Sequence, residues 1–256
     1  MEKFNCAMCG KCCRVLRNFN ELGEEEKALR KKEYQNTNEK TIFYILPEIE
    51  KASLALFEFE VEHLKQLAKE KNIVLKIAPL KGFLSSDGTP IIFNWMLDHD
   101  SCPFLENNRC LIYDDRPLVC QSFPLFTSAA SALEGEKKIM IFPSNLCPSM
   151  KATSEITGQM TFDDFRKKLC EVYGDIFPGS VKFDLTNFFI EKYIEALMQK
   201  GLINVTSKIT RDEFINRCQK SSVSLFDFML QKRLARKEEL EDLPNRVQSI
   251  ANEIIK

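Results

Sequence analysis

Four of the ten cysteines in this chain fall within eight consecutive positions near its start. They stand in the segment Cys6-Ala-Met-Cys9-Gly-Lys-Cys12-Cys13, with two residues between the first and second cysteines and again between the second and third. Thiolates held this close repel one another unless an ion or a covalent bond joins them. Because steps of two residues form tight loops around metal ions, the segment predicts a metal site.

The first three cysteines also match the C-x2-C-x2-C run that opens the cysteine string of bacterial-type ferredoxins. In that string a fourth cysteine follows after three more residues and precedes a proline, whereas here Cys13 directly follows Cys12. Adjacent side chains point to opposite sides of a strand, or about 100° apart on a helix. We therefore expect Cys12 and Cys13 to serve different sites, or one of them to support a site without binding the ion. The missing ligands must come from other parts of the chain.

Four further cysteines lie between residues 102 and 147. Three belong to the segment Cys102-Pro-Phe-Leu-Glu-Asn-Asn-Arg-Cys110-Leu-Ile-Tyr-Asp-Asp-Arg-Pro-Leu-Val-Cys120-Gln-Ser-Phe-Pro, and the last is in the step Cys147-Pro148. A Cys-Pro step, as at Cys102 and Cys147, also closes the ferredoxin string. The candidate metal ligands are therefore the following eight residues: Cys6, Cys9, Cys12, Cys13, Cys102, Cys110, Cys120 and Cys147.

The order and spacing of these cysteines resemble those of the YkgJ-type CxxCxxCC cysteine-cluster family, which implies chelation of zinc or iron. The family pattern is CxxCGxCC, then CPFL…C-x-IY-x-x-RP-x-x-C-R-x-FP, then a final Cys-Pro. This chain matches it with CAMCGKCCR, CPFLENNRCLIYDDRPLVCQSFP and LCP, over about residues 4–150. The resemblance implies that all eight cysteines bind metal. One departure is Gln121, which stands where the pattern has arginine, so a contact of that arginine to an anion or to sulfur is not carried over.

The cysteine domain also resembles that of flagellin lysine-N-methylase, which implies a cluster-dependent enzyme that methylates a protein lysine with S-adenosylmethionine. The residues themselves give this alternative little support. No G-x-G-x-x-G loop follows a strand, no C-x3-C-x2-C radical string occurs, and only two histidines are available for a Cys/His or Ser/His/Asp arrangement. Incubation with labelled S-adenosylmethionine and cell extract would test for methyl transfer.

The balance of charge argues against nucleic-acid binding, which requires a basic surface. The chain has 36 Lys+Arg and 37 Asp+Glu, which gives a net charge of −1. A thiolate-bound metal centre is negative, so cations close to it are stabilising. Six basic residues stand near cysteines in the sequence: Lys3, Lys11, Arg14, Arg17, Arg109 and Arg116. Of these we expect Arg14 and Arg116 to contact the cofactor, and ordinary solvated charge is the alternative.

The start of the chain is polar and enters the cysteine segment at once, so the sequence predicts no signal peptide. The longest uncharged run, residues 117–133, contains proline, serine and glutamine and is a poor membrane span. We therefore expect a cytoplasmic protein with no membrane span. Thiols stay reduced in the cytoplasm, which favours metal binding over disulfide formation.

The sequence predicts an α+β fold in which a small antiparallel sheet and hairpins present cysteine-bearing loops, followed by a helical C-terminal region. An acidic run at its start predicts a mostly polar helix over 24–35, and apolar periodicity predicts a helix over 57–71. Turn signals predict hairpins over 81–97 and 126–142. Pro117 is expected to open a short helix that presents Cys120. A rigid scaffold of this kind holds ligand-bearing loops in place.

From about residue 155 onward the sequence shows mainly helical patterns. Helices are predicted over 161–173, 185–200, 214–220, 225–239 and 244–255. The predicted caps are Thr161, Asp184, Thr210 and Ser224 at helix starts, with Gly201 after a helix end. We therefore expect two domains, a metal-binding domain at 1–155 and a helical region at 156–256 packed on it.

Two histidines and two cysteines remain outside the eight candidate ligands. His99 precedes Cys102 closely and could be a ligand or a proton relay, but a polar loop at the end of a hairpin is the preferred interpretation. His63 is expected on the surface of a helix. Cys170 and Cys218 stand alone in helical segments and are expected to behave as small core residues.

We expect the protein to bind metal, with an iron–sulfur cluster of the [4Fe–4S] type as the preferred cofactor because of the C-x2-C-x2-C run and the Cys-Pro steps. Eight thiolates suffice for two four-thiolate sites, or for one cluster and one structural zinc. Zinc is the main alternative because its four-cysteine sites use the same ligand at similar spacings. An electron carrier or a metal-delivery protein would share these features, and the expected partner is a redox partner or a protein substrate.

Overall fold

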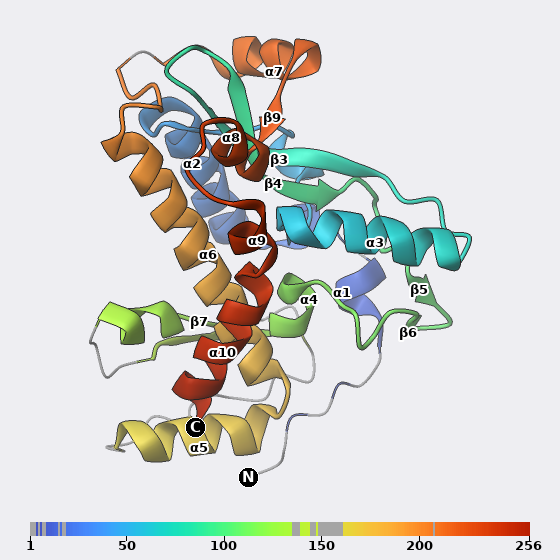
Figure 1. Cartoon of the computed structure of the whole chain (residues 1–256). Helices are drawn as coiled ribbons and strands as arrows, with labels where there is room; N and C mark the ends of the chain where they lie inside the picture. The colour runs from blue at the N-terminus through green and yellow to red at the C-terminus, as the bar shows by residue number, and fades with distance from the viewer. Residues whose placement is uncertain are drawn as a thin grey trace. The chain divides into compact units, whose positions relative to one another are not determined.

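The computed structural model describes residues 4, 6, 9–14, 16, 19–134, 139–143, 147, 161–206 and 208–256 (Figure 1). It has the predicted α+β class, with a helical C-terminal region. The chain divides into two compact units, each drawn from segments distant in sequence. Unit 1 comprises Met1–Cys12, Glu106–Glu191 and Glu241–Lys256, and unit 2 comprises Cys13–Leu105 and Lys192–Leu240. The domain boundary expected at residue 155 lies outside the described residues.

The centre of unit 2 is an antiparallel hairpin of two long strands, β3 (Ile77–Leu84) and β4 (Pro90–Leu97) (Figure 1). This confirms the predicted hairpin, and its turn contains Gly88 with φ of 84°. Three short strands complete the sheet: β1 (Phe43–Ile45) beside β3, and β2 (Ala55–Leu56) and β9 (Val223–Ser224) beside β4. Nearly every residue of β4 is buried, which explains why its sequence is apolar on both faces, with the buried Asn94 as the exception.

Helices of unit 2 cover this sheet. They are α2 (Glu24–Lys40), α3 (Glu58–Glu70), α7 (Arg211–Lys220) and α8 (Leu225–Gln231), of which α3, α7 and α8 contact β4 while α2 and α7 contact β1. The helix predicted over 24–35 continues to Lys40. The predicted apolar face of α3 is confirmed, because Val61 and Leu64 are buried.

A close stack of aromatic rings joins α7 to the sheet. The rings of Tyr44 and Phe214 lie 4.2 Å apart at an angle of 7°. The Tyr44 hydroxyl donates to the carbonyl of Ile209 at 3.2 Å and accepts from its N–H at 3.1 Å. A Cβ on Gly82 would stand 2.6 Å from the Ile91 carbonyl oxygen and 2.9 Å from the Phe214 ring, so only glycine fits beneath this stack.

Unit 1 contains short elements, two of which carry a cysteine each, and longer helices. The short elements are β5 (Leu105–Glu106), β6 (Arg109–Cys110), α4 (Leu118–Ser122), β7 (Leu125–Thr127), the 3₁₀ helix η3 (Ala129–Glu134) and β8 (Ile141–Pro143). The longer helices are α5 (Phe162–Tyr173), the first part of α6 (Ile176–Gln199) and α10 (Leu243–Ile255). Thr161 caps α5, as predicted, by accepting the N–H of Asp164 at 3.1 Å.

The second predicted hairpin is confirmed in its pairing but not in its extent. Strands β7 and β8 pair in antiparallel fashion, with Phe126 opposite Phe142. The first strand was expected to reach residue 133, but it ends at Thr127 and the 3₁₀ helix η3 follows. The expected turn over 134–136 lies largely outside the described residues.

Helix α6 begins earlier than the sequence predicts. Asp184 was expected to cap a helix starting at Leu185, but α6 starts at Ile176 and contains Asp184 in its interior. Pro178 does not delay the start, because proline is tolerated in the first turn of a helix. The Asp184 carboxylate instead accepts the N–H of Ala130 at 2.7 Å, at the start of η3. Gly201, with φ of 66°, ends the helical run as predicted.

The single helix predicted over 225–239 is interrupted in the structure. Ser224 caps α8 as expected, but α8 ends at Gln231 and a separate short helix, α9 (Lys237–Glu241), follows. The break is a left-handed C-terminal turn at Arg233, with φ of 53°, closed by the N–H of Leu234 donating to the Met229 carbonyl at 2.9 Å. No glycine marks this turn, so it could not be predicted from the local sequence.

Replacing Arg233 with glycine should stabilise the protein by about 1 kcal/mol, because glycine adopts positive φ without the cost that a side chain imposes. Urea unfolding of the two proteins would measure this difference. A matched control is Gln231→Gly, at the last helical residue of α8, two residues before Arg233. This variant should destabilise the protein by up to about 1 kcal/mol. Equal losses of unfolding free energy in both variants would contradict the claim that the positive φ of Arg233 is strained.

A buried carboxyl group joins α3 to the start of α8. The Glu58 carboxylate accepts the N–H of Phe226 at 3.1 Å. Burial raises the pKa of Glu58 to about 7, although hydrogen bonds from Ser224 and Phe226 oppose this, and the charge of Asp227 raises it further. The folded state therefore holds a proton that the unfolded chain releases at lower pH, and stability should fall as pH rises from about 4.5 to 7.

Glu58→Gln removes this titration while keeping an acceptor for the Phe226 N–H. The variant should match the wild type near pH 4.5 and exceed its free energy of unfolding by at most about 3 kcal/mol at pH 8. Denaturant unfolding at several pH values measures the difference. Glu62→Gln on the exposed side of α3 is the control, and a Glu58→Gln difference that does not change with pH would contradict the assignment.

No helix in the described part of the chain combines the length and the apolar character needed to cross a membrane.

Candidate metal centre

The opening cysteine segment is anchored to unit 1 at its beginning. The N–H of Phe4 donates to the Val172 carbonyl at 2.6 Å, at the end of α5. Cys6 and Cys9 follow and are exposed. Gly10, with φ of 67°, then turns the chain into the short helix α1 (Lys11–Arg14), which carries Cys12 and Cys13.

Cys13 lies beside the next cysteine-bearing segment, which begins at Cys102, 89 residues later in the sequence. The N–H of Cys102 donates to the Cys13 carbonyl at 2.6 Å, and the N–H of Leu16 donates to the Asp100 carbonyl at 3.0 Å. Both bonds lie within unit 2. They join the backbones of the two segments, whereas the meeting of their sulfurs around an ion stays a prediction.

Cys12 lies within electrostatic range of Cys110, and both belong to unit 1. Burial raises the pKa of the Cys110 thiol. The N–H of Ile112 and the charge of Arg116 act in the opposite direction, and the Cys12 thiolate adds to the increase. Two thiolates that repel each other in this way are stabilised when a cation binds between them.

The loop between Cys110 and Cys120 is held by Arg116. Its Nε donates to the Tyr113 carbonyl at 2.7 Å, and its guanidinium lies 3.7 Å from the centre of the Tyr113 ring. Arg116 is thus near Cys110 and fixed in place. The direct contacts of Arg14 and Arg116 to a cofactor remain predictions.

Cys120 stands on α4, the short helix after Pro117, as the sequence predicts. The next residue, Gln121, departs from the family pattern and has well-defined contacts of its own. Its Nε2 donates to the Arg116 carbonyl at 2.6 Å, and its Oε1 accepts from Lys182 Nζ at 2.9 Å. A Cβ on Gly179 would lie 2.6 Å from the Gln121 carbonyl oxygen, so α6 packs directly against α4.

These contacts of α6 were not predicted from the sequence. Gly179, Lys182 and Asp184 lie outside the segment that carries the cysteine pattern, and each contacts part of that segment within unit 1. Spacing rules apply within one element and carry no information about which distant helix will support it. These three contacts become visible only in the folded chain.

The remaining candidates take the positions that the sequence favoured for them. The Lys76 N–H donates to Nε2 of His99 at 2.8 Å, which fits the loop interpretation. His63 is exposed on α3. Cys218 packs against Tyr44, Leu84 and Phe214 as a core residue, and burial raises the pKa of its thiol to about 11. Burial also raises the pKa of Cys170.

The thiols fit zinc or iron in their chemistry, because soft thiolates select these ions over magnesium or calcium. None of the ten cysteines forms a disulfide bond in the structure. Within the described ranges, no three or more Cys, His, Asp or Glu side chains form a group shaped to hold an ion. The structure therefore places Cys12 within electrostatic range of Cys110 and joins the backbone of Cys13 to that of Cys102, and the described residues show no complete coordination set.

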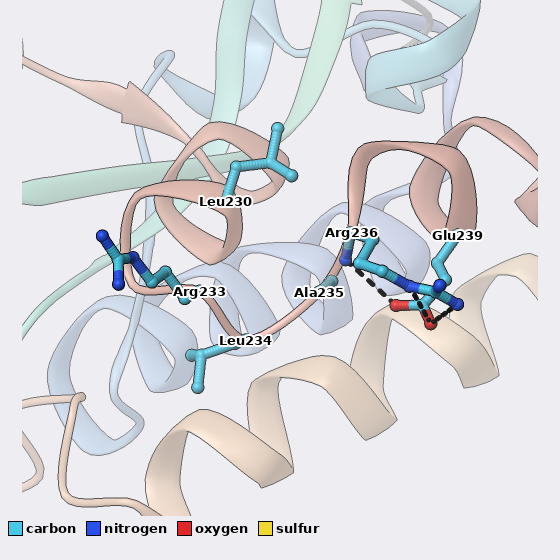
Figure 2. Close-up of a pocket in the computed structure, with 6 residues that line it drawn as sticks. All are labelled: Leu230, Arg233, Leu234, Ala235, Arg236 and Glu239. Atoms are coloured by element: carbon cyan, nitrogen blue, oxygen red, sulfur yellow. Dashed lines mark hydrogen bonds and ion pairs between the residues drawn. The ribbon is translucent and has the colours of Figure 1, made fainter.

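A pocket of about 340 Å³ lies elsewhere in unit 2, at the connection between α8 and α9 (Figure 2). Its lining residues are Leu230, Arg233, Leu234, Ala235, Arg236 and Glu239. Arg236 is held by Glu239 through bonds of 2.8 and 3.1 Å. None of its lining residues is a cysteine, so this pocket is separate from the candidate metal ligands.

Comparison with known proteins identifies the cysteine pattern. The model of the CxxCxxCC family, described as a putative zinc- or iron-chelating domain, matches residues 5–148, which is more than half of the chain. The chain belongs to the CxxCxxCC family. Membership supports binding of zinc or iron, and the matched range contains the eight candidate cysteines while excluding Cys170 and Cys218. No curated protein and no solved structure matches the chain.

Proposed function

We propose that this CxxCxxCC protein holds one or more iron–sulfur clusters through its eight pattern cysteines. The [4Fe–4S] cluster is the preferred type. The observation that supports the proposal is that Cys12 lies within electrostatic range of Cys110, and that the N–H of Cys102 donates to the Cys13 carbonyl. The C-x2-C-x2-C run and the Cys-Pro steps favour iron–sulfur over zinc, since both occur in ferredoxin strings.

The two neighbouring cysteines of α1 support the division of the ligands between two sites. Cys12 has Cys110 as its neighbour, whereas the backbone of Cys13 contacts that of Cys102. Because adjacent residues on a helix point about 100° apart, one small ion does not readily bind both. Eight thiolates would fill two four-thiolate sites, or one cluster and one structural zinc.

The test is metal and sulfide analysis of protein purified without oxygen, together with its visible absorption. Iron and acid-labile sulfide in equal amounts, with broad visible absorption that bleaches on reduction, would support the [4Fe–4S] proposal. A colourless protein with stoichiometric zinc and no sulfide would overturn it and establish the zinc alternative. Zinc is the second candidate because the family description names it and thiolate donors suit it equally well.

A further inference from the structure

Helix α6 places a charged side chain against the arm of the chain that carries Cys120. Lys182 is half-buried, and its ammonium donates to Gln121 Oε1 at 2.9 Å. Among the described residues this is its only hydrogen bond, and no carboxylate pairs with it. Burial lowers the pKa of Lys182, as expected for an ammonium group that lacks a counter-charge.

The contact is rigid on both sides. Gln121 follows Cys120 directly in α4 and holds the Arg116 carbonyl with its other amide atom, at 2.6 Å. Gly179, one turn before Lys182 on α6, lies so close to the Gln121 backbone that a Cβ would clash at 2.6 Å. The amide of Gln121 thus bridges Lys182 to the loop that leads from Cys110 to Cys120.

We infer that Lys182 is a positioning residue of the metal centre: through Gln121 it fixes the Cys120 arm, and its positive charge offsets the negative charge of the thiolate-bound metal. The inference rests on the proposed function. A half-buried cation without a counter-ion carries a desolvation cost in the protein alone, and this cost is offset once a negative group is assembled nearby. The proposal therefore predicts coupling between Lys182 and the bound metal.

The experiment compares Lys182→Met, Lys182→Arg and the wild type, each purified without oxygen and loaded with its metal. Methionine keeps the length of the side chain and removes the charge, whereas arginine keeps the charge. Lys167→Met, an exposed lysine of α5, removes the same charge at a distance from this contact. The readouts are the midpoint reduction potential of the cluster and competition for the metal by a chelator.

Lys182→Met should lower the midpoint potential, because removal of a positive charge disfavours the added electron. A tenfold change in the ratio of reduced to oxidised cluster, which is about 59 mV for one electron, is the expected size. Metal affinity should fall about tenfold, in the range seen for residues that support metal ligands. Lys182→Arg should restore most of both values, and Lys167→Met should change neither.

The outcomes separate this inference from the proposed function. If the wild type carries zinc, it has no reduction potential to compare, and the chelator competition alone tests the role of Lys182. The expected order of zinc affinities is then the same, with Lys182→Met the weakest. If the wild type binds metal but Lys182→Met matches Lys167→Met in potential and affinity, the role of Lys182 is refuted while metal binding stands. If the wild type binds no metal, the proposed function itself fails. Gln121→Leu, which breaks the bridge but leaves the lysine, should reproduce the loss of affinity, and an unchanged affinity would refute the bridging role.

Discussion

Cys110→Ser is expected to lower the metal content of the purified protein to a small fraction of that of the wild type. A serine hydroxyl is a poor ligand for zinc or iron, because it is protonated at neutral pH and harder than a thiolate. Cys12→Ser should have a comparable effect, since Cys12 and Cys110 lie within electrostatic range of each other. Elemental analysis of protein purified without oxygen measures the loss directly.

The chain offers its own control for this experiment. Cys170 is half-buried on α5 and lies outside the range matched by the family, so Cys170→Ser should retain the metal. Because loss of metal can follow from misfolding, the far-ultraviolet circular dichroism of each variant should be recorded alongside. Full metal content in both Cys12→Ser and Cys110→Ser would remove these residues from the site.

Phe214→Ala should destabilise unit 2 by about 3–5 kcal/mol, the usual cost of deleting a buried phenylalanine ring. The ring is fully buried and stacks on Tyr44, with Leu84 in the same cluster and the glycine of β3 beneath it. An alanine would leave a cavity that neither strand nor helix can fill, because the surrounding backbone is fixed by strand pairing. Urea unfolding of matched metal-loaded samples measures the change.

A second variant distinguishes lost packing from general disruption. Phe214→Leu retains most of the apolar contact but loses the stacked ring, so its cost should be clearly smaller than that of alanine. A loss of less than about 1 kcal/mol in Phe214→Ala would show that the stack contributes little and that the core is elsewhere.

Local signals in the sequence predicted most helix starts. Thr161, Thr210 and Ser224 each accept a backbone N–H at the first turn of the helix they were expected to cap. A cap of this kind depends on residues three positions apart, so it can be recognised without a fold. Asp184 shows the limit, because its partner Ala130 lies fifty-four residues away and nothing near Asp184 indicates it.

The candidate site shows the same contrast between local signals, which can be predicted, and contacts between distant residues, which cannot. The eight candidate ligands were chosen from their spacing and from the resemblance to the family, and the family match covers all eight. The pairing of Cys12 with Cys110, and of Cys13 with Cys102, depends on how α1 is oriented, which no spacing rule gives. Lys182 was not predicted at all, because a lysine on an amphipathic helix is ordinarily a solvated charge.

Within each unit, some of the cysteine segments make contacts of different kinds. Hydrogen bonds between backbones join Phe4 to Val172 and Cys13 to Cys102, so these contacts do not require bound metal. The thiolates of Cys12 and Cys110 lie within electrostatic range and repel each other. A bound cation would offset this repulsion. The fold therefore prepares the approach of the segments, and the metal is expected to complete the site and stabilise the folded state.

The most direct test of thiolate coordination is X-ray absorption at the metal edge of wild-type protein purified without oxygen. The account predicts that the first coordination shell consists of sulfur, with four ligands at about 2.3 Å around each metal. An iron–sulfur cluster would add a shell of neighbouring iron atoms, whereas zinc would show the sulfur shell alone. A first shell dominated by nitrogen or oxygen would contradict the claim that the eight cysteines hold the metal.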